Sequence, residues 1–418
     1  MIKPMIKKTI INKTKKNKTQ KQTKKNTNKH IINILTLVKE YYKEKNDKIR
    51  VNSYEKAIYQ ISKFIKPIMK GSELAHLDGI GKGMVEKIDT IISSGTLPIL
   101  NDIQKIKNNT INNNNNNSNT KLNTLLGFSN TFVTKLINNY NTRTISNVKQ
   151  LVNNNKLKLT KIQTLGLKYY KDLQTLIPRD EITKLTNIFK TIVNNINYTM
   201  LVSGSYPSNT KNYSKDIDIL IVKHKNIKDN IGSGDLKNII NKIKNHFEEL
   251  NKDKENNKEN NKENNKENNK ENNKENNKEN NKENNKENYL ESISLGSKKF
   301  MGLIKSPISN KMRHIDIRLV TMNELPYSYL YYSSGKMFNK LIREKFKKKG
   351  YKLNEYGLYK IRYNKGFEKI KFDEESNLVL DNINIKNREI NLLNYIKKIE
   401  QELFKLASMD YKTVQERY

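Results

Sequence analysis

The sequence reads Gly204-Ser205, then Asp216-Ile217-Asp218-Ile219-Leu220-Ile221-Val222, and much later Arg313-His314-Ile315-Asp316-Ile317-Arg318-Leu319-Val320. Side chains alternate along a β-strand, so Asp216 and Asp218 project from one face while Ile217 and Ile219 enter the core. A neighbouring strand that carries Asp316 completes a cluster of three carboxylates. Such carboxylates repel one another unless divalent cations lie among them, and hard oxygen ligands select Mg²⁺ or Mn²⁺. The pattern predicts two-metal phosphoryl transfer.

A turn precedes the acidic pair. Gly204 and Ser205 follow the apolar run from Tyr198 to Val202, which predicts a turn at the end of a strand. The backbone amides and the hydroxyl of such a turn can lie against a triphosphate. An isolated Asp-x-Asp most often just ends an ordinary strand. Together with the Gly-Ser turn, however, it is characteristic of nucleotidyltransferases.

Composition limits the class of protein. The chain of 418 residues is long enough for about two to four domains, yet only 34% of it is hydrophobic, so part of it is expected to stay unfolded. A formal net charge of +37 favours a polyanionic partner, above all nucleic acid, although codon bias in an AT-rich genome accounts for part of the Lys excess. The chain has no Cys, which excludes disulfides and Cys-based zinc sites.

The sequence shows no run close to the ~18 to 20 apolar residues of a membrane span and no signal peptide. We therefore expect a soluble intracellular protein without membrane contact. Its compartment is expected to be the nucleus, or the host cell or virion if the protein is viral. The Asn, Lys and Ile content suits a large DNA virus or a parasite with an AT-rich genome.

Two segments are predicted to be disordered. Residues 1–30 contain eleven Lys and no acidic residue, and we interpret them as a disordered basic arm. From Lys254 to Asn288 the tetrapeptide Lys-Glu-Asn-Asn repeats, so we expect a disordered insert over 252–288 that follows a helix at about 235–250. The Asn run from Asn112 to Asn117 predicts a linker between two helical parts.

The remaining pattern predicts an α+β chain. Helical periodicity over 31–110 indicates an N-terminal helical domain, and 111–185 is expected to form a second helical subdomain. Strand patterns mark a catalytic palm with a mixed sheet over 186–326. A small α+β subdomain is expected over 327–418.

Short glycine turns stand at the start of two predicted helices. Gly79-Ile80-Gly81 directly precedes a helical stretch, and glycines there let the backbone approach a DNA phosphate beside free helix amides. This spacing is a recurrent helix-hairpin-helix signature, which we favour over a plain turn between helices. A weaker copy contains Gly127, with Ser129 where glycine is expected.

These motifs stand in the order seen in family X DNA polymerases of the DNA polymerase beta type, which the chain resembles from about residue 31 to 418 apart from the insert. The motifs are the two hairpins, Gly166-Leu167-Lys168-Tyr169-Tyr170 with Ile177-Pro178-Arg179, the Gly-Ser turn with the three Asp, Lys299-Phe300-Met301-Gly302, and Phe338-Asn339-Lys340 with Arg343. The resemblance implies a repair polymerase that fills gaps in base excision repair, acting as a monomer on primer-template or gapped DNA with dNTPs.

The resemblance also implies roles for single residues. Asp216 and Asp218 would bridge two Mg²⁺ ions, for which Mn²⁺ can substitute, and Asp316 would bind the catalytic ion and help activate the primer 3′-hydroxyl. The other implied contacts are Gly204 and Ser205 to the triphosphate, Tyr331, Tyr332 and Gly335 to the sugar, Asn339 to the incoming base, Arg343 to the template, and Gly79, Gly81 and Gly127 to DNA, with a monovalent cation at the hairpins.

The chain departs from the family pattern at several contacts. Leu176 and Pro207 stand where the family has cationic triphosphate contacts, which predicts weaker nucleotide binding. The small residues after the Tyr pair are permuted to Ser333-Ser334-Gly335, so sugar discrimination is expected to be less strict. Lys87 matches the Schiff-base lysine of the 5′-deoxyribose-phosphate lyase site, but Ala75, Gly83 and other neighbours replace polar family positions.

Two other functions stay open. One is a template-independent nucleotidyltransferase, such as a terminal transferase or an RNA-extending enzyme. The other is a noncatalytic protein that recognises gaps or nicks in DNA.

Overall fold

The computed structural model describes residues 28–64, 66–103, 121–194, 198–223, 232, 234–266, 289–362, 366–370, 372 and 385–418. Contacts divide the chain into two compact units, residues 1–118 and 119–418, and each is treated separately below. The predicted linker at Asn112–Asn117 and the predicted boundary at 110/111 lie outside the described residues. None of the helices described is long and apolar enough to cross a membrane.

The N-terminal unit is helical, as the periodicity predicts. It contains α1 (Lys29–Glu44), α2 (Lys48–Lys63), the 3-10 helix η1 (Gly71–Leu74) and α3 (Lys82–Ser94). Apolar side chains spaced three and four residues apart, such as Ile31, Ile34, Leu35 and Val38 of α1, point into one shared core.

The unit begins earlier than the predicted end of the basic arm at residue 30. Asn28 is buried, and its amide nitrogen donates to the carbonyl oxygens of Phe64 (3.1 Å) and Lys66 (2.9 Å), while its Oδ1 accepts from the Ile68 amide. These bonds satisfy polar groups that burial would otherwise leave unpaired. Residues 28–30 therefore belong to the folded unit, and the rest of the predicted arm lies outside the described residues.

A small helical subdomain opens the second unit. It consists of η2 (Lys121–Thr124), α5 (Asn130–Tyr140), α6 (Ile145–Asn153), α7 (Lys161–Lys168) and α8 (Tyr170–Leu173). Its core gathers the buried side chains of Leu122, Leu125, Phe128, Val133, Leu136, Val148 and Leu167.

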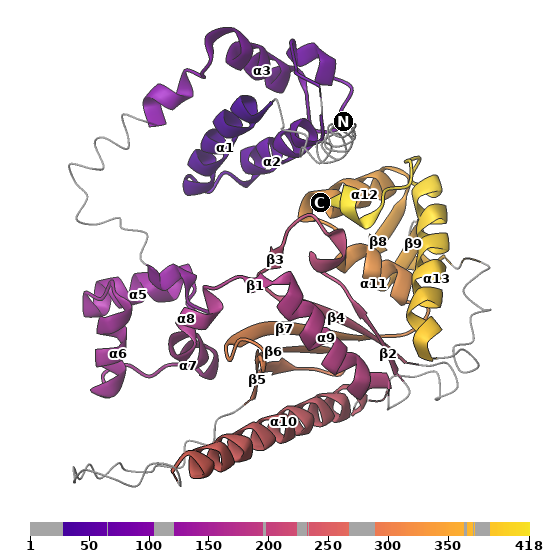
Figure 1. Cartoon of the computed structure of the whole chain (residues 1–418). Helices are drawn as coiled ribbons and strands as arrows, with labels where there is room; N and C mark the ends of the chain where they lie inside the picture. Colours follow the sequence, from indigo (N-terminus) through magenta and orange to yellow (C-terminus); the bar gives the residue numbers. More distant parts are fainter. Residues whose placement is uncertain are drawn as a thin grey trace, which may run out of the picture. The chain divides into compact units, whose positions relative to one another are not determined.

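The predicted mixed sheet is confirmed. Its strands are β2 (Tyr198–Val202), β4 (Ile217–Lys223), β5 (Leu290–Leu295), β6 (Lys299–Lys305) and β7 (Met312–Val320), in the order β2-β4-β7-β6-β5. The central pair β4 and β7 is parallel, and the other neighbours are antiparallel. Helices α9 (Arg179–Asn194) and α10 (Asp235–Lys266) lie along the sheet (Figure 1) and share one apolar core with it, which leaves the other face of the central strands for polar side chains.

Three predicted boundaries are wrong. The boundary at 185/186 falls inside α9, because Ile182, Leu185 and Phe189 pack as one face of a single helix on the sheet. Helix α10 continues to Lys266, well into the segment predicted as disordered from residue 252. Extending a helix that packing has already nucleated costs far less than starting one. Residues 267–288 of the predicted insert lie outside the described residues.

The third wrong boundary, at 326/327, falls inside α11 (Leu325–Tyr332), the first helix of the C-terminal subdomain. It is followed by α12 (Lys336–Lys348), the three-stranded sheet of β8 (Tyr351–Asn354), β9 (Gly357–Arg362) and β10 (Gly366–Lys369), α13 (Ile385–Leu406) and the 3-10 helix η5 (Val414–Arg417). The predicted α+β character of this subdomain is thereby confirmed.

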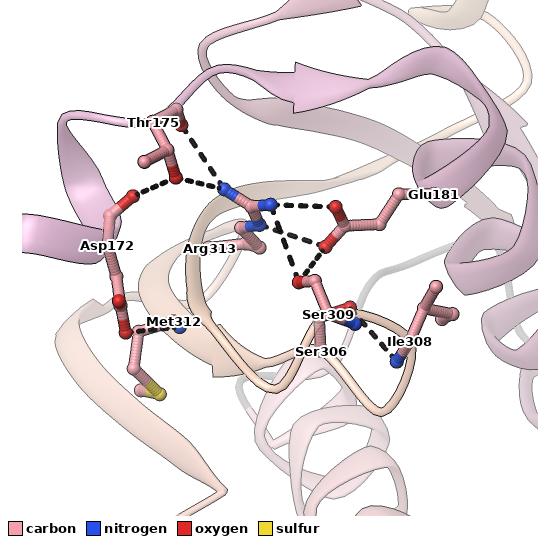
Figure 2. Close-up of polar contacts among 8 residues, drawn as sticks. All are labelled: Asp172, Thr175, Glu181, Ser306, Ile308, Ser309, Met312 and Arg313. Carbon is pink, nitrogen blue, oxygen red and sulfur yellow. Dashed lines mark hydrogen bonds and ion pairs between the residues drawn. The ribbon is translucent and has the colours of Figure 1, made fainter.

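A buried ion pair joins α9 to β7 within the palm (Figure 2). Arg313, at the start of β7, contacts both carboxylate oxygens of Glu181 on α9, at 2.9 and 2.7 Å, with side-chain exposures of only 3% and 4%. Arg313 Nη1 also donates to Thr175 Oγ1 (2.8 Å), and the Ser309 hydroxyl donates to Glu181 (2.6 Å). Burial acts to raise the pKa of Glu181, but the hydrogen bonds from Arg313 and Ser309 outweigh it and lower that pKa.

Candidate active site

The three predicted carboxylates lie on the same polar face of the sheet. Asp218 of β4 and Asp316 of β7 are register partners in the parallel pair, and Asp216 directly precedes β4. Their neighbours Ile217, Ile219, Ile315 and Ile317 are buried in the core below, as alternation requires. The parallel register therefore sets the two strand carboxylates side by side.

Burial and neighbouring negative charge raise the pKa values of two of these carboxyl groups. Burial, with the charges of Asp216 and Asp316, raises the pKa of Asp218 to about 7, although Arg318 opposes the shift. Burial also raises the pKa of Asp316, against the lowering effect of His314 and Lys299.

The donor set fits divalent cations. Oδ1 of Asp316 is buried and has no hydrogen-bond partner, and an oxygen in that state costs free energy unless a ligand meets it. Hard carboxylate oxygens suit Mg²⁺ or Mn²⁺. Among the described residues, no three side chains of the metal-binding types are yet gathered close enough to hold an ion.

Stability without added metal is expected to fall as the pH rises from about 4 to about 7. The folded protein keeps a proton on Asp218, whose pKa is about 7, in a range where the unfolded chain has released it. The carboxylate then costs up to about 4 kcal/mol of unfolding free energy above pH 7. Asp218→Asn should raise the melting temperature at pH 8, whereas Asp180→Asn, at an exposed carboxylate, should not. Equal melting temperatures for Asp218→Asn and wild type at pH 8 would contradict the assignment.

The Gly-Ser turn lies directly against the acidic cluster. Gly204 has φ +66°, and a Cβ atom there would come within 2.0 Å of Asp218 Oδ2, so only glycine fits. The Ser203 amide donates to the Asp218 carbonyl oxygen (2.9 Å), and the Ser205 and Ser214 hydroxyls are hydrogen-bonded at 2.9 Å. The 3-10 helix η3 (Tyr206–Ser208) follows at once. The turn is thus held beside Asp218 from both its ends.

Two short strands and Arg179 support the Gly204-Ser205 turn. β1 (Ile177–Pro178) pairs with β3 (Tyr213–Ser214), and Arg179 donates to the Tyr206 carbonyl oxygen (2.7 Å) while lying over the Tyr206 ring. The guanidinium of Arg179 therefore supports the turn through the backbone and ring of Tyr206.

The predicted sugar-contacting residues lie where α11 ends and α12 begins. Tyr331 and Tyr332 meet edge to face, with ring centroids 4.8 Å apart. The side-chain nitrogen Nδ2 of Asn339 donates to the carbonyl oxygens of Tyr331 (2.8 Å) and Ser334 (3.1 Å). Gly335 is the N-cap residue of α12. In this structure Asn339 therefore fixes the shape of the turn.

Arg343 is also engaged within the protein. Its guanidinium lies 4.4 Å from the Tyr331 ring centroid, and Nη2 is 3.7 Å from Glu355 Oε2. Arg318 takes the equivalent position over Tyr332, at 4.8 Å. Each tyrosine of the pair thus has an arginine on its face, which ties the turn to β7 on one side and to the loop before β9 on the other.

Both hairpins have the same backbone form. Gly79 and Gly127 have φ of +88° and +82°, and each stands two residues before the N-cap of a helix, Gly81 before α3 and Ser129 before α5. The Ser129 side chain accepts from the Phe132 amide, so serine at the glycine position caps its helix. The second hairpin, which the sequence marks as weaker, is therefore fully formed.

Lys87 lies on α3 of the N-terminal unit, half-buried, with Nζ donating to the Gly83 carbonyl oxygen (2.9 Å). Tyr54 is buried and stacks on Tyr42. Arg50 pairs with Asp47 (3.0 Å) and lies over Tyr42. The contact described for the Lys87 amine is therefore with the backbone of its own helix.

Several residues of the site were not predicted. His314 and Arg318 stand two positions either side of Asp316, so strand alternation alone could have placed them on the same face. Lys299 reaches this site from β6, where it is the register partner of Arg318. No local sequence pattern predicts that Ser214 belongs to the site, because the pairing of β3 with β1 brings it to Ser205.

Comparison with known proteins agrees with this geometry. Residues 26–97 match a helix-hairpin-helix domain, 176–322 match the DNA polymerase beta palm, and 328–417 match the DNA polymerase beta thumb. DNA polymerase lambda of Arabidopsis thaliana is 23% identical over 337 residues, 79% of this chain and 54% of the relative. DNA polymerase lambda of Rattus norvegicus is 23% identical over 344 residues, 80% of this chain and 49% of the relative.

This chain therefore spans about half the length of the curated relatives it matches. The matched palm contains the whole acidic cluster with its Gly-Ser turn, and the matched thumb contains the Tyr331–Gly335 turn. With hairpin, palm and thumb in this order, the chain belongs to the family X DNA polymerases.

Proposed function

We propose that this protein is a DNA-directed DNA polymerase that transfers a nucleotide from a dNTP to a primer 3′-hydroxyl in gapped DNA, in the manner of base excision repair. The observation that carries the proposal is the register of Asp218 with Asp316, which, with Asp216, gathers three carboxylates beside a glycine turn. Members of the family generally use divalent metal ions.

Each residue of the site has a role in this proposal. Asp216 and Asp218 would hold two Mg²⁺ ions, or Mn²⁺, and Asp316 would hold the one nearer the primer terminus. Bound there, the ions would lower the pKa of the attacking hydroxyl and neutralise the triphosphate. Gly204 and Ser205 would bind the triphosphate through backbone amides and a hydroxyl. The Tyr331–Gly335 turn would position the sugar.

DNA would be bound by both hairpins. Gly79, Gly81 and Gly127 would allow a phosphate to approach the backbone at the start of α3 and α5, and a monovalent cation would bind there. On the second helical subdomain, a hollow of about 500 Å³ is lined in part by Lys149, Lys168, Lys171, Tyr169 and Tyr170, a composition that suits nucleic acid. We propose that one copy of the chain suffices, in the nucleus or, for a viral protein, in the host cell or virion.

Extension of a primer in a one-nucleotide gap tests the proposal against its first alternative. We expect incorporation only of the complementary nucleotide, and far less extension of the same primer as a single strand. Equal extension of both substrates, without regard to the template base, would identify a template-independent nucleotidyltransferase. Tight gap binding without any incorporation would identify a noncatalytic DNA-binding protein.

A 5′-deoxyribose-phosphate lyase activity is proposed for the N-terminal unit. The amine of Lys87 would attack the sugar aldehyde to form a Schiff base, close to the hairpin that would bind the DNA. Borohydride reduction should then trap wild-type protein on 5′-deoxyribose-phosphate DNA, and Lys87→Ala should lower trapping at least about tenfold. Lys43→Ala, at an exposed lysine of α1, is the control. Equal trapping of Lys87→Ala and wild type would sink the assignment.

A further inference from the structure

A carboxylate of the second helical subdomain bonds to the backbone of the strand that carries Asp316. Asp172 lies on α8, and its Oδ2 accepts from the Met312 amide at the start of β7 (3.0 Å), as Figure 2 shows. Strand β6 pairs with β7 from Met312 onward, whereas β4 pairs with it only from Ile315. Asp172 thus supplies the acceptor for a backbone donor that β4 does not reach.

The next residue of β7 bonds to the same segment. Arg313 Nη1 donates to Thr175 Oγ1 (2.8 Å) and to the Thr175 carbonyl oxygen (3.2 Å). The hydroxyl and the amide of Thr175 in turn donate to the Asp172 carbonyl oxygen, which closes a turn at the end of α8. The segment 172–175 is therefore attached to two consecutive residues of β7 (Figure 2).

Apolar contacts beside these bonds place the second hairpin on the sheet. Met312 is buried in a small core with Leu303 of β6 and Leu165 of α7. Leu126 packs against this core, and it directly precedes Gly127 of the hairpin. The hairpin is thus held at the end of the sheet where β7 begins.

The position of this attachment along β7 relates it to the acidic cluster. Met312 and Asp316 are four residues apart on one strand, so their side chains lie on the same face and about 13 Å apart. About four phosphates of one DNA strand span that distance along the helix axis. A strand held by the hairpin would therefore meet the carboxylates within a few nucleotides.

We propose that Asp172 is a positioning residue, which fixes the second helical subdomain to β7 and thereby sets the place of the primer end relative to the acidic cluster. The inference rests on the proposed function for the DNA that the subdomain holds. Apolar contacts alone have no direction, whereas the hydrogen bond from Met312 to the carboxylate fixes the orientation of α8 on the strand.

Single-turnover incorporation into one-nucleotide-gapped DNA, at saturating DNA and dNTP, tests this inference. Asp172→Ala removes the acceptor, and Asp172→Asn keeps an oxygen that can accept from Met312. Asp172→Glu keeps the charge but is one methylene longer. Asp180→Ala, at an exposed carboxylate of α9, is the matched control. Urea unfolding of each variant shows whether it is folded under the assay conditions.

We expect Asp172→Ala to lower the rate roughly 10- to 100-fold, because a misplacement of about 1 Å is enough for such a loss. Its dNTP dissociation constant should be unchanged, since the Gly204-Ser205 turn is untouched. Asp172→Asn and Asp180→Ala should stay within about threefold of wild type. A contact that only stabilised the fold would leave the rate of the folded variant unchanged. An Asp172→Ala rate within about threefold of wild type would therefore overturn the inference.

Distances between two spin labels test the attachment itself. The chain has no Cys, so Gln150→Cys on α6 and Asn187→Cys on α9, both at exposed positions, would be the only labelled sites. In the gapped-DNA complex we expect one narrow distance distribution for wild type and for Asp172→Asn, and a broader one for Asp172→Ala. If Asp172→Ala does not fold, Asp172→Glu decides. A shifted distance with a lower rate would support the inference, and wild-type values of both would overturn it.

The outcome is separable from that of the proposed function. If wild type incorporates nucleotide and folded Asp172→Ala does so equally fast, only the inference fails. Wild type that incorporates no nucleotide would overturn the proposed function and, with it, the placement of a primer end by Asp172.

Discussion

Asp316→Asn is expected to lower the rate of nucleotide incorporation into gapped DNA by at least about a thousandfold. The substitution keeps the size of the side chain but removes one of the three charges that would hold the metal ions on the β4–β7 pair. Charge stabilisation by a catalytic metal is worth several kcal/mol, and about 4 kcal/mol corresponds to that factor. Single-turnover incorporation with saturating dNTP measures the effect.

The control for this variant is Asp180→Asn. Asp180 is an exposed carboxylate on α9 that pairs with Lys184, so its loss should leave the rate unchanged. Affinity for gapped DNA should be the same in both variants, because the hairpins that we expect to bind DNA are untouched. An Asp316→Asn enzyme within tenfold of wild type would show that the chemistry does not depend on this carboxylate.

Glu181→Ala is expected to lower the free energy of unfolding by about 3 to 5 kcal/mol, the usual result of leaving one charge of a buried pair without its partner. Arg313 would stay buried at the start of β7. Its described hydrogen-bond acceptors would then be Thr175 and Ser309. Because this pair joins α9 to β7 (Figure 2), the loss should appear as a weaker attachment of α9 to the sheet. Urea unfolding of the full chain measures the change.

A surface pair provides the matched comparison. Lys190 and Glu389 are 2.7 Å apart with side-chain exposures of 29% and 39%, and Glu389→Ala should cost less than about 1 kcal/mol. Replacing Glu181 and Arg313 together by Leu and Met should recover much of the loss, since no buried charge then remains. A loss below 1 kcal/mol for Glu181→Ala alone would contradict the structural role of the pair.

The acidic face of the palm could be predicted because it depends on local alternation. Asp216, Asp218 and Asp316 are flanked by isoleucines, and the structure buries those isoleucines while it leaves the carboxylates on the opposite face. The sequence did not show that Asp218 and Asp316 would be register partners. That pairing depends on a parallel contact between strands about a hundred residues apart, which no local pattern encodes.

Boundaries were harder to predict because packing overrides local composition. The repeat after residue 252 has a polar, Asn-rich sequence, yet α10 runs to Lys266 as the continuation of a packed helix. Ser129 looked like a defect in the second hairpin, but it takes the N-cap conformation and adds a capping hydrogen bond. In both places the neighbouring structure determines the backbone more strongly than the residue type does.

Contacts between residues far apart in the sequence were not predicted. Arg313 meets Glu181 from 132 positions away, and η5 reaches the turn after Gly204-Ser205 from the far end of the second unit. Such contacts depend on the completed fold, so neither periodicity nor motif spacing predicts them.

Anomalous scattering from Mn²⁺ tests most directly whether the three aspartates form a metal centre. Crystals would contain the protein, one-nucleotide-gapped DNA with a dideoxy-terminated primer, and the complementary dNTP. We predict two anomalous peaks, both bridged by Asp216 and Asp218, one of which also contacts Asp316. A bound nucleotide without any metal peak at these carboxylates would contradict the account.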